Sequence, residues 1–393
     1  MEYVRLNELC NINIGKTPSR NKQIYWGKGV KWLSISDLKD KFINETKEQI
    51  TEKAISECNM KIVPKNTVVM SFKLSIGKVA ILKEDMYTNE AIANFPIKDD
   101  TKLIPEYLYY SIKTLDFTNT DRAVMGSTLN KSKLNELKIP YCAVDKQNKI
   151  VNVLDKAQSL IDKRKAQIEA LDKLVKSRFI EMFGDPISNT RGWCTGILEK
   201  YIDVIGGYAF KSTGFVDYGI PVLKIGNINA GYFKPTNLMF WKKDEKLNKY
   251  LIKPEDLVIS LTGTVGKDDY GNVCIMGYDY EEYYLNQRNA KLEIKSENSL
   301  TKYYLMYLLR VQEIKKRLTG ISRGVRQANI ANKDILNLEI PIPSIELQNQ
   351  FADFVKQVDK LKFELEKSLK ELDDNFNSLM QRAFKGELFK QEL

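Results

Sequence analysis

An internal repeat constrains this chain more than any other feature. Leu-Lys-Ile-Pro at 137–140 returns as Leu-Glu-Ile-Pro at 338–341, 201 residues later, and the same offset carries Gln147 onto Gln348. Each copy leads into a long charged segment whose apolar residues have heptad spacing. A chain of 393 residues is long enough to bury two separate cores. The repeat therefore predicts two similar domains, each followed by a long helix.

The elements expected inside each domain also recur in order. In the first half, strands are expected over 68–72 and, after a glycine turn, over 77–82, and a helix is expected to start at Pro105. The second half repeats the order with shifted spacing, and the counterparts are Gly77 and Gly266, Tyr107 and Tyr304, and Gly126 and Gly324. Loops of different length on one scaffold are where binding specificity usually diverges.

The two long segments carry the heptad pattern of paired helices. One row is apolar throughout and comprises Leu154, Ile161, Ile168, Val175 and Met182 in the first segment, and Phe351, Val358, Leu365, Leu372 and Leu379 in the second. Arg164, Arg178 and Lys362 interrupt the other row. Such residues can set the register of a helix pair, or their long side chains can reach out of an ordinary seam. The pattern leaves both possibilities open.

The connection between the segments favours an antiparallel pair, because a whole domain is built between the end of the first helix and the start of the second. We therefore predict an α+β fold with two similar globular domains and an antiparallel coiled coil, related by pseudo-two-fold symmetry. The expected boundaries are a first domain over 1–145, a first helix over 146–184, a second domain over 185–345 and a second helix over 346–388.

Charge and composition narrow the function. The net charge of +10 favours a polyanion such as nucleic acid as the partner. The absence of histidine excludes histidine-based general-base catalysis and histidine metal ligands. The five cysteines are scattered without a Cys-x-x-Cys pair, so neither a zinc site nor a disulfide framework is expected. Since the sequence lacks a signal-peptide core and a long apolar run, a cytoplasmic location is expected.

Several motifs, in duplicate order, carry a family resemblance. They are Thr-Pro-Ser-Arg at 17–20, Lys-Trp-Leu-Ser-Ile-Ser-Asp-Leu at 31–38, Met-Phe-Gly-Asp-Pro at 182–186, Gly-Tyr-Ala-Phe-Lys-Ser at 207–212 and the two Ile-Pro segments. Together they resemble the specificity subunits of type I restriction–modification systems over nearly the whole chain. Each motif alone is weak, whereas the duplicated order is specific.

The resemblance implies a function and its partners. Each globular domain would be a target recognition domain that reads one half of a split, asymmetric site in double-stranded DNA. The helices would set the spacing and dock two methyltransferase subunits, and restriction/translocase subunits would join that core. The chain itself would bind no cofactor and no metal, S-adenosylmethionine being expected on the methyltransferase partners. Independently of the resemblance, the sequence lacks an Asn-Pro-Pro-Tyr/Phe methyltransferase motif and a phosphate-binding nucleotide loop.

Candidate DNA-binding residues are cationic, amide, hydroxyl and tyrosine side chains in expected loops, since such groups contact phosphates and base edges. In the first domain they are Ser19, Arg20, Lys22, Lys73, Ser75, Lys78, Arg122, Ser127, Thr128 and Asn130. In the second they are Lys211, Ser212, Thr264, Lys267, Tyr270, Arg288, Arg323, Arg326, Gln327 and Asn329. The segment 323–329 is the densest cluster.

Three alternatives come from other classes. A stand-alone DNA-binding regulator would need no docking surface, yet Phe179, Phe183, Phe384 and Phe389 place apolar rings near the helix ends. Those rings could equally cap the globular domains. A nuclease or methyltransferase fragment is disfavoured by the missing motifs. A purely structural coiled-coil scaffold is disfavoured by the tyrosine-rich domains and the net charge.

Overall fold

The computed structural model describes residues 1–73, 75–115, 117, 122–123, 126–127, 129–228, 231–267, 269–320 and 327–389. The chain divides into two compact units, here called unit 1 (Met1–Lys165 with Lys367–Leu393) and unit 2 (Ala166–Glu366). Each unit therefore contains one globular domain and parts of both long helices. No helix in the described ranges has the length and apolar character needed to cross a bilayer.

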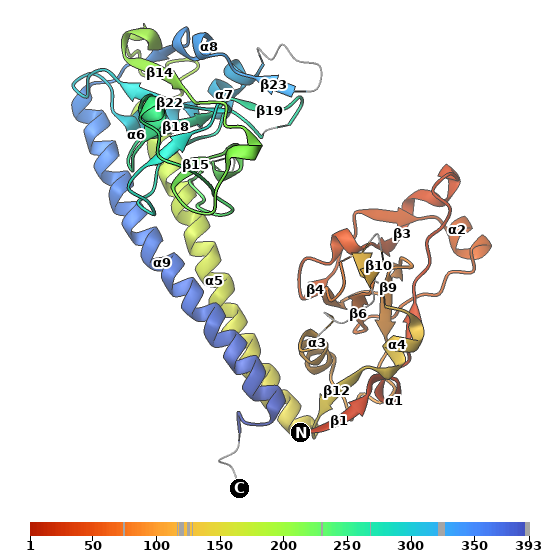
Figure 1. Cartoon of the computed structure of the whole chain (residues 1–393). Coiled ribbons are helices and arrows are strands. Elements are labelled where there is room, and N and C mark those ends of the chain that lie inside the picture. Colours follow the sequence, from red (N-terminus) through yellow and green to blue (C-terminus); the bar gives the residue numbers. More distant parts are fainter. Residues whose placement is uncertain are drawn as a thin grey trace. The chain divides into compact units, whose positions relative to one another are not determined.

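Unit 1 is built on two main sheets (Figure 1). The five-stranded sheet has the order β2 (Asn13–Ile14), β9 (Ile92–Phe95), β6 (Val68–Ser71), β7 (Val79–Leu82) and β4 (Phe42–Ile43). The three-stranded sheet has the order β5 (Glu48–Ile50), β3 (Trp26–Leu33) and β8 (Tyr87–Thr88). Short ladders join β1 (Glu2–Arg5) to β12 (Lys138–Tyr141) and β10 (Arg122–Ala123) to β11 (Gly126–Ser127). The helices are α1 (Leu6–Leu9), α2 (Glu52–Glu57), α3 (Pro105–Lys113) and α4 (Lys131–Glu136).

Unit 2 repeats this plan. Its first sheet has the order β14 (Ile202–Gly206), β22 (Asn289–Ile294), β18 (Leu257–Ser260) and β20 (Val273–Ile275). Its second has the order β16 (Met239–Trp241), β15 (Ile220–Leu223), β21 (Tyr283–Leu285) and β17 (Leu251–Ile252). Short ladders pair β13 (Thr195–Ile197) with β24 (Glu339–Pro341) and β19 (Thr262–Thr264) with β23 (Gln327–Asn329). The helices α6 (Lys302–Leu309), α7 (Gln312–Thr319) and α8 (Asn332–Leu336) complete the domain.

The predicted strands and helix of the first half are confirmed as β6, β7 and α3, and Pro105 occupies the first turn of α3. The paired glycines Gly77 and Gly266 both adopt a positive φ, of 88° and 77°, which suits glycine because it has no Cβ. The counterpart proposed for Gly126, Gly324, lies outside the described residues.

Two buried hydrogen-bond sets explain why the Ile-Pro segments and the glutamines recur. The Tyr107 hydroxyl donates to the Pro140 carbonyl at 2.9 Å, and the Tyr304 hydroxyl donates to the Pro341 carbonyl at 2.8 Å. These bonds attach α3 to β12 and α6 to β24, and each of these two strands leads into a long helix.

The side-chain amides of Gln147 and Gln348 join the same regions. The Gln147 Oε1 accepts from the Ile104 amide, and its Nε2 donates to the carbonyls of Lys102 and Cys142. In the same way, the Gln348 Oε1 accepts from the Thr301 amide, and its Nε2 donates to the carbonyls of Ser299 and Pro343. Both side chains are fully buried, so each satisfies backbone groups that would otherwise lack partners.

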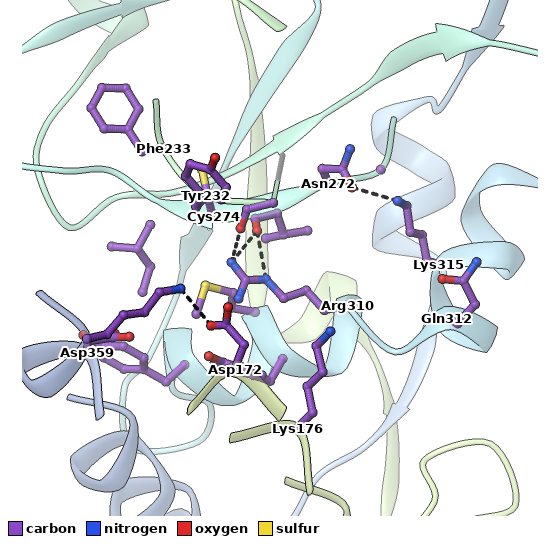
Figure 2. A pocket seen from close by; sticks show the side chains of 18 of the residues that line it. Asp172, Lys176, Tyr232, Phe233, Asn272, Cys274, Arg310, Gln312, Lys315 and Asp359 are labelled. Atoms are coloured by element: carbon purple, nitrogen blue, oxygen red, sulfur yellow. Dashed lines mark hydrogen bonds and ion pairs between the residues drawn. The ribbon is translucent and has the colours of Figure 1, made fainter. Parts of the chain in front are cut away.

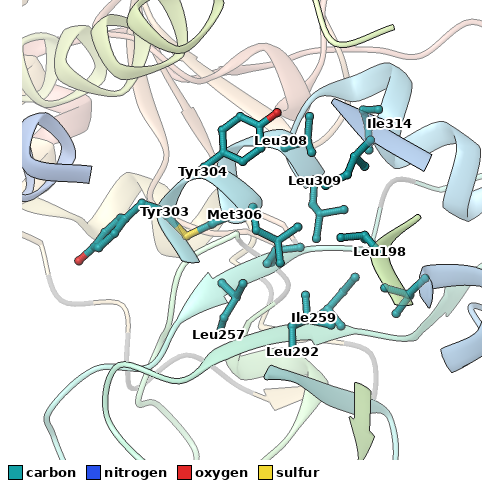
Figure 3. Packing of buried hydrophobic residues seen from close by; sticks show 14 of the residues in the cluster. Leu198, Leu257, Ile259, Leu292, Tyr303, Tyr304, Met306, Leu308, Leu309 and Ile314 are labelled. Carbon is teal, nitrogen blue, oxygen red and sulfur yellow. The ribbon is translucent and has the colours of Figure 1, made fainter. Parts of the chain in front are cut away.

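The core of unit 2 lies between its first sheet and α6 (Figure 3). Figure 3 shows Leu257, Ile259 and Leu292 from the strands facing Met306 and Leu309 from the helix. All are buried, and burying one such side chain contributes roughly 1.5–3 kcal/mol. The equivalent core of unit 1 includes Val68, Met70 and Phe95 packed with Leu108 and Ile112 of α3.

The long helices are α5 (Val144–Phe183) and α9 (Ile345–Lys385). The predicted apolar row is nowhere exposed: Leu154, Ile161, Val175, Phe351 and Val358 are buried, and Ile168, Met182, Leu365, Leu372 and Leu379 are half-buried. In unit 1 the first part of α5 and the last part of α9 share one core.

In unit 2 two contacts give the relative direction of the helices. The Lys362 ammonium pairs with Asp172 at 2.8 Å, and the Arg178 guanidinium lies 5.9 Å from the ring centre of Phe354. Moving forward along α5 therefore means moving backward along α9, so the pair is antiparallel, as predicted. Arg178 also pairs with Glu181 at 2.9 Å. These long side chains thus reach charged partners from an otherwise ordinary seam.

The phenylalanines near the helix ends pack against the globular domains, which is the second of the two interpretations that the sequence left open. Phe179, Phe183 and Phe384 are buried, and the ring centroids lie 4.8 Å apart for Phe183 and Tyr304 and 5.4 Å apart for Phe384 and Tyr107. Phe389 is partly buried against the unit 1 core. These rings cap the globular domains, so they supply no free docking surface.

Candidate nucleic-acid interface

The first predicted group in unit 1 lies just before β3, where Ser19, Arg20 and Lys22 are exposed. Arg20 donates to both carboxylate oxygens of Glu48, one at 2.9 Å, and its guanidinium lies 3.8 Å from the ring centre of Trp26. The hydrogen bond from Arg20 holds the pKa of Glu48 below its ordinary value. The planar guanidinium is therefore held in one orientation by a carboxylate and an indole.

The second group lies in the connection between β6 and β7. Lys73 is half-buried and Ser75 and Lys78 are exposed, and the Ser71 hydroxyl donates to the Ser75 carbonyl and accepts from the Lys78 amide at 3.1 Å. This buried serine fixes the turn from inside, so the hydroxyl and ammonium groups on the turn stay at the surface.

The remaining unit 1 candidates lie between β10 and α4. The backbones of Arg122 and Ser127 face each other in the β10–β11 ladder, whereas Thr128 lies outside the described residues. Asn130 caps α4, since its Oδ1 accepts from the Lys133 amide at 2.8 Å. Asparagine is among the preferred N-cap residues, so this side chain already has a structural task.

In unit 2, backbone hydrogen bonds bring separate candidates together. Leu261 donates to the Arg288 carbonyl at 2.8 Å and accepts from the Ile330 amide at 2.8 Å. The β19–β23 ladder then places Thr264 opposite Gln327 and residue 262 opposite Asn329. Three loops far apart in the sequence therefore meet at one edge of the domain, with exposed Arg288, Thr264 and Asn329.

Other candidates in unit 2 have different positions. Thr264 is bonded through its hydroxyl to Asp269 at 2.9 Å, Lys267 is exposed on the turn that follows β19, and Lys211 and Ser212 are exposed near the start of the 3-10 helix η4 (Ser212–Gly214). Arg323 and Arg326 lie outside the described residues, as does most of the cluster 323–329.

The prediction that Tyr270 is a DNA-binding loop residue is wrong. Its side chain is 3 % exposed, belongs to the hydrophobic core of unit 2 and donates its hydroxyl hydrogen bond to the Thr319 carbonyl at 2.8 Å. The sequence suggested a loop tyrosine because glycine and aspartate surround it, but the ring packs under the β19 turn instead.

A cavity of about 510 Å³ in unit 2 shows how the domain meets its helices (Figure 2). Asp172 of α5 points toward Lys362 of α9, Lys315 donates to the Asn272 side chain at 2.7 Å, and Arg310 donates to the carbonyls of Val273 and Gly231. These charges have partners within the wall. The cavity therefore has the character of a polar junction between domain and helices.

No group of three or more aspartate, glutamate or cysteine side chains that could hold a metal ion occurs among the described residues. The cysteines with the strongest pKa shifts, Cys10 and Cys274, have their pKa raised to about 12, mainly by burial, which opposes thiolate formation.

Comparison with known proteins decides the family. The model of the type I restriction modification DNA specificity domain matches residues 1–170 and again 195–372. The chain belongs to this family. The resemblance inferred from the duplicated motifs is thereby confirmed, and the two matched stretches correspond to the two halves of the repeat.

Individual relatives agree with the family match. A type I restriction enzyme MjaIX specificity subunit from Methanocaldococcus jannaschii is 25% identical over 99% of this chain and 94% of its own length. The MjaVIII specificity subunit of the same organism is 27% identical over 92% of this chain and 86% of its own length. The EcoR124I/EcoR124II specificity subunit of Escherichia coli is 27% identical over 41% of each chain.

Solved structures confirm the fold. A chain from a study of complex assembly and conformational transition of the type I R-M system matches with a TM-score of 0.59 and 17% identity, covering 98% of both chains. The S subunit of M. genitalium matches with a TM-score of 0.50 and 16% identity, covering 98% of this chain and 96% of its own.

Proposed function

We propose that this chain is the DNA-reading subunit of a type I restriction–modification complex, and that each unit reads one half of a split site. The observation that supports it most is the duplicated domain, matched twice by one DNA specificity family. Exposed candidate side chains such as Arg20 in unit 1 and Arg288 in unit 2 differ between the two copies, which suits two different half-sites. The comparisons give no support to a stand-alone regulator.

Exposed apolar side chains on the helices suit the docking of methyltransferase subunits. Leu160 is 53 % exposed and Leu361 is 50 % exposed, and the repeat offset of 201 residues relates the two positions. Leu174, Ile180 and Phe363 add further exposed apolar surface on these helices. The repeat-related pair Leu160 and Leu361 favours two copies of one partner, and restriction/translocase subunits would join that core.

In this proposal the chain performs no chemistry and binds no cofactor of its own. S-adenosylmethionine would be held by the methyltransferase subunits, and the complex would act on DNA in the cytoplasm. The chain would contribute affinity through phosphate contacts and sequence choice through base contacts.

Adenine methylation mapping in cells tests the proposal. One culture would express the neighbouring methyltransferase subunit together with this chain. A second culture would express the methyltransferase subunit without it. A split motif that disappears when the chain is deleted is the expected result. An unchanged methylation pattern with both proteins expressed would refute it.

A matched pair of variants tests the docking surface. Leu160→Asp with Leu361→Asp is expected to abolish co-purification of the methyltransferase subunit, because a carboxylate cannot be buried there without a partner. Gln357→Asp, an exposed change on the same helix, should leave co-purification intact. Retention of the partner by the double variant would exclude this surface.

A further inference from the structure

Unit 1 contains a cavity of about 430 Å³ beside the segment that precedes β3. This volume is in the range of small-molecule sites, roughly 300–1,000 Å³. Its wall includes three lysines, Lys16, Lys61 and Lys131, and no carboxylate among the described lining residues. The cavity wall is therefore strongly cationic.

The lysines can serve a ligand. The Lys16 ammonium donates to the Cys58 carbonyl at 2.7 Å, and an ammonium has three N–H donors, so two remain. Lys61 and Lys131 are exposed at the surface of the unit. Cations gathered in a described lining that includes no carboxylate favour an anionic group such as phosphate.

The rest of the lining is apolar or amide. Ile14, Met60, Pro64 and Pro96 supply apolar surface, and Asn13 and Asn59 supply amides. Asn94 also lines the cavity, is 2 % exposed and donates from Nδ2 to the Thr88 hydroxyl at 3.0 Å, yet its Oδ1 has no hydrogen-bond partner. A buried acceptor without a donor is costly, and a ligand N–H would satisfy it.

Unit 2 has a different arrangement at the matching position. Asn94 lies opposite Asn13 and Val69 in its sheet, and Lys291 lies opposite Ile205 and Val258 in the equivalent sheet. Lys291 pairs with Asp256 at 3.1 Å and Glu293 at 3.0 Å. At that position unit 2 has a charge that is already neutralised, whereas unit 1 has a neutral amide with an unmet acceptor.

We propose that the unit 1 cavity binds a nucleoside phosphate. The lysines would hold the phosphate, the apolar wall would pack against the base, and the Asn94 acceptor would receive an N–H of the ligand. The nucleotide could be free in solution or could be a single nucleotide displaced from bound DNA. The second source rests on the proposed function, and the first does not.

The first experiment uses deoxyadenosine 5′-monophosphate and the full chain, with binding measured by calorimetry. Binding of one equivalent is expected, and Lys61→Glu or Lys131→Glu should weaken it about tenfold or more, because each reverses a charge at the phosphate. Glutamate at position 131 suits the first turn of α4, so that variant should fold even if the other does not. Lys39→Glu, an exposed lysine of unit 1 outside the cavity lining, is the matched control.

The second experiment uses a duplex with a one-nucleotide bulge of 2-aminopurine, whose fluorescence rises when the base leaves the stack. A rise with the unchanged chain that is lost in Lys61→Glu but kept in Lys39→Glu would identify DNA as the source. Binding of the free nucleotide without that rise would identify the free source.

Two outcomes overturn the proposal. One is that neither probe distinguishes Lys61→Glu and Lys131→Glu from Lys39→Glu. The other is that inorganic phosphate competes as well as the nucleotide, because the cavity would then recognise only an anion. If deletion of the chain leaves the methylation pattern unchanged while the free nucleotide still binds, the proposed function is refuted and the nucleotide site is retained.

Discussion

Units 1 and 2 share one set of buried hydrogen bonds, here called the frame, but differ in other side chains. In both, a tyrosine hydroxyl bonds the carbonyl of the Ile-Pro proline and a buried glutamine joins three backbone groups. The short turns after β3 and β15 match too, since Asp37 accepts from the Ser34 amide and Asn227 from the Lys224 amide, each at 2.9 Å.

The side chains around β3 and β15 differ between the two units. Unit 1 has Arg20 held on Trp26 by Glu48, whereas unit 2 has an aromatic group in which Phe210 packs 5.1 Å from Trp241 and Lys224 lies 4.3 Å from the ring centre of Phe215. Buried side-chain-to-backbone bonds are therefore shared by the two units, whereas the side chains packed around these strands differ.

The largest expected effect is at the frame. Gln348→Leu would leave the Thr301 amide and two carbonyls without partners, so the free energy of unfolding should fall by about 3 kcal/mol or more. Urea unfolding of the full chain measures it, with Gln350→Leu, exposed on the same helix, as control. Equal stability of the two variants would show that the buried amide does not hold the frame.

The next effect should be confined to one half of the target. Arg288→Ala removes an exposed cation from the edge where three loops of unit 2 meet, so DNA affinity should fall by about 1–3 kcal/mol. Methylation mapping should then show relaxed sequence choice in one half of the split motif only. Loss of both halves together would argue that the units do not read separately. Lys295→Ala, whose ammonium pairs with Asp203, is the control cation.

A smaller effect tests whether the two frames are equally strong. Tyr107→Phe and Tyr304→Phe each remove one buried hydroxyl bond, and each should cost about 1 kcal/mol of unfolding free energy. Urea unfolding of each variant measures the two losses of unfolding free energy, with each variant's own transition midpoint. A cost in one unit but none in the other would show that the two hydroxyl hydrogen bonds do not contribute equally to stability.

The smallest effect is the pH response of the Arg20 pair. The pKa of Glu48 is lowered in the folded chain by the hydrogen bond from Arg20, so the pair stabilises the fold above the ordinary carboxyl pKa. That contribution is lost as the pH falls through the lowered pKa, and it should be small because both side chains are exposed. Comparing the unchanged chain with Glu48→Gln by urea unfolding at pH 7 and in acid checks it, and a difference that grows in acid would contradict it.

Much of the fold follows from the sequence because repeated polar residues mark repeated bonds. Gln147 and Gln348 stood out by their offset, and each occupies the same buried position. The apolar rows of α5 and α9 were predictable because heptad spacing indicates which side of a helix is buried. The length of β3 and the extra edge strand β4 were not, since short strands depend on cross-strand partners that spacing does not reveal.

The candidate interface was less predictable. Residue type suggested Arg20 and Arg288, but nothing in the sequence showed that Glu48 would hold the first while backbone bonds would bring the second beside β19. Tyr270 failed for a related reason, because flanking glycine indicates a turn without saying which side chain turns inward. The unmet acceptor of Asn94 left no sequence signal at all.

The division of the chain has a genetic consequence. Unit 2 is one uninterrupted stretch, 166–366, and both of its boundaries fall inside the long helices α5 and α9. One crossover within each helix would exchange an entire unit as a single coding cassette. The joints would fall in continuous helical backbone, where a new sequence needs only to keep the apolar row in phase. New combinations of half-sites could then arise by recombination without any change to the other unit.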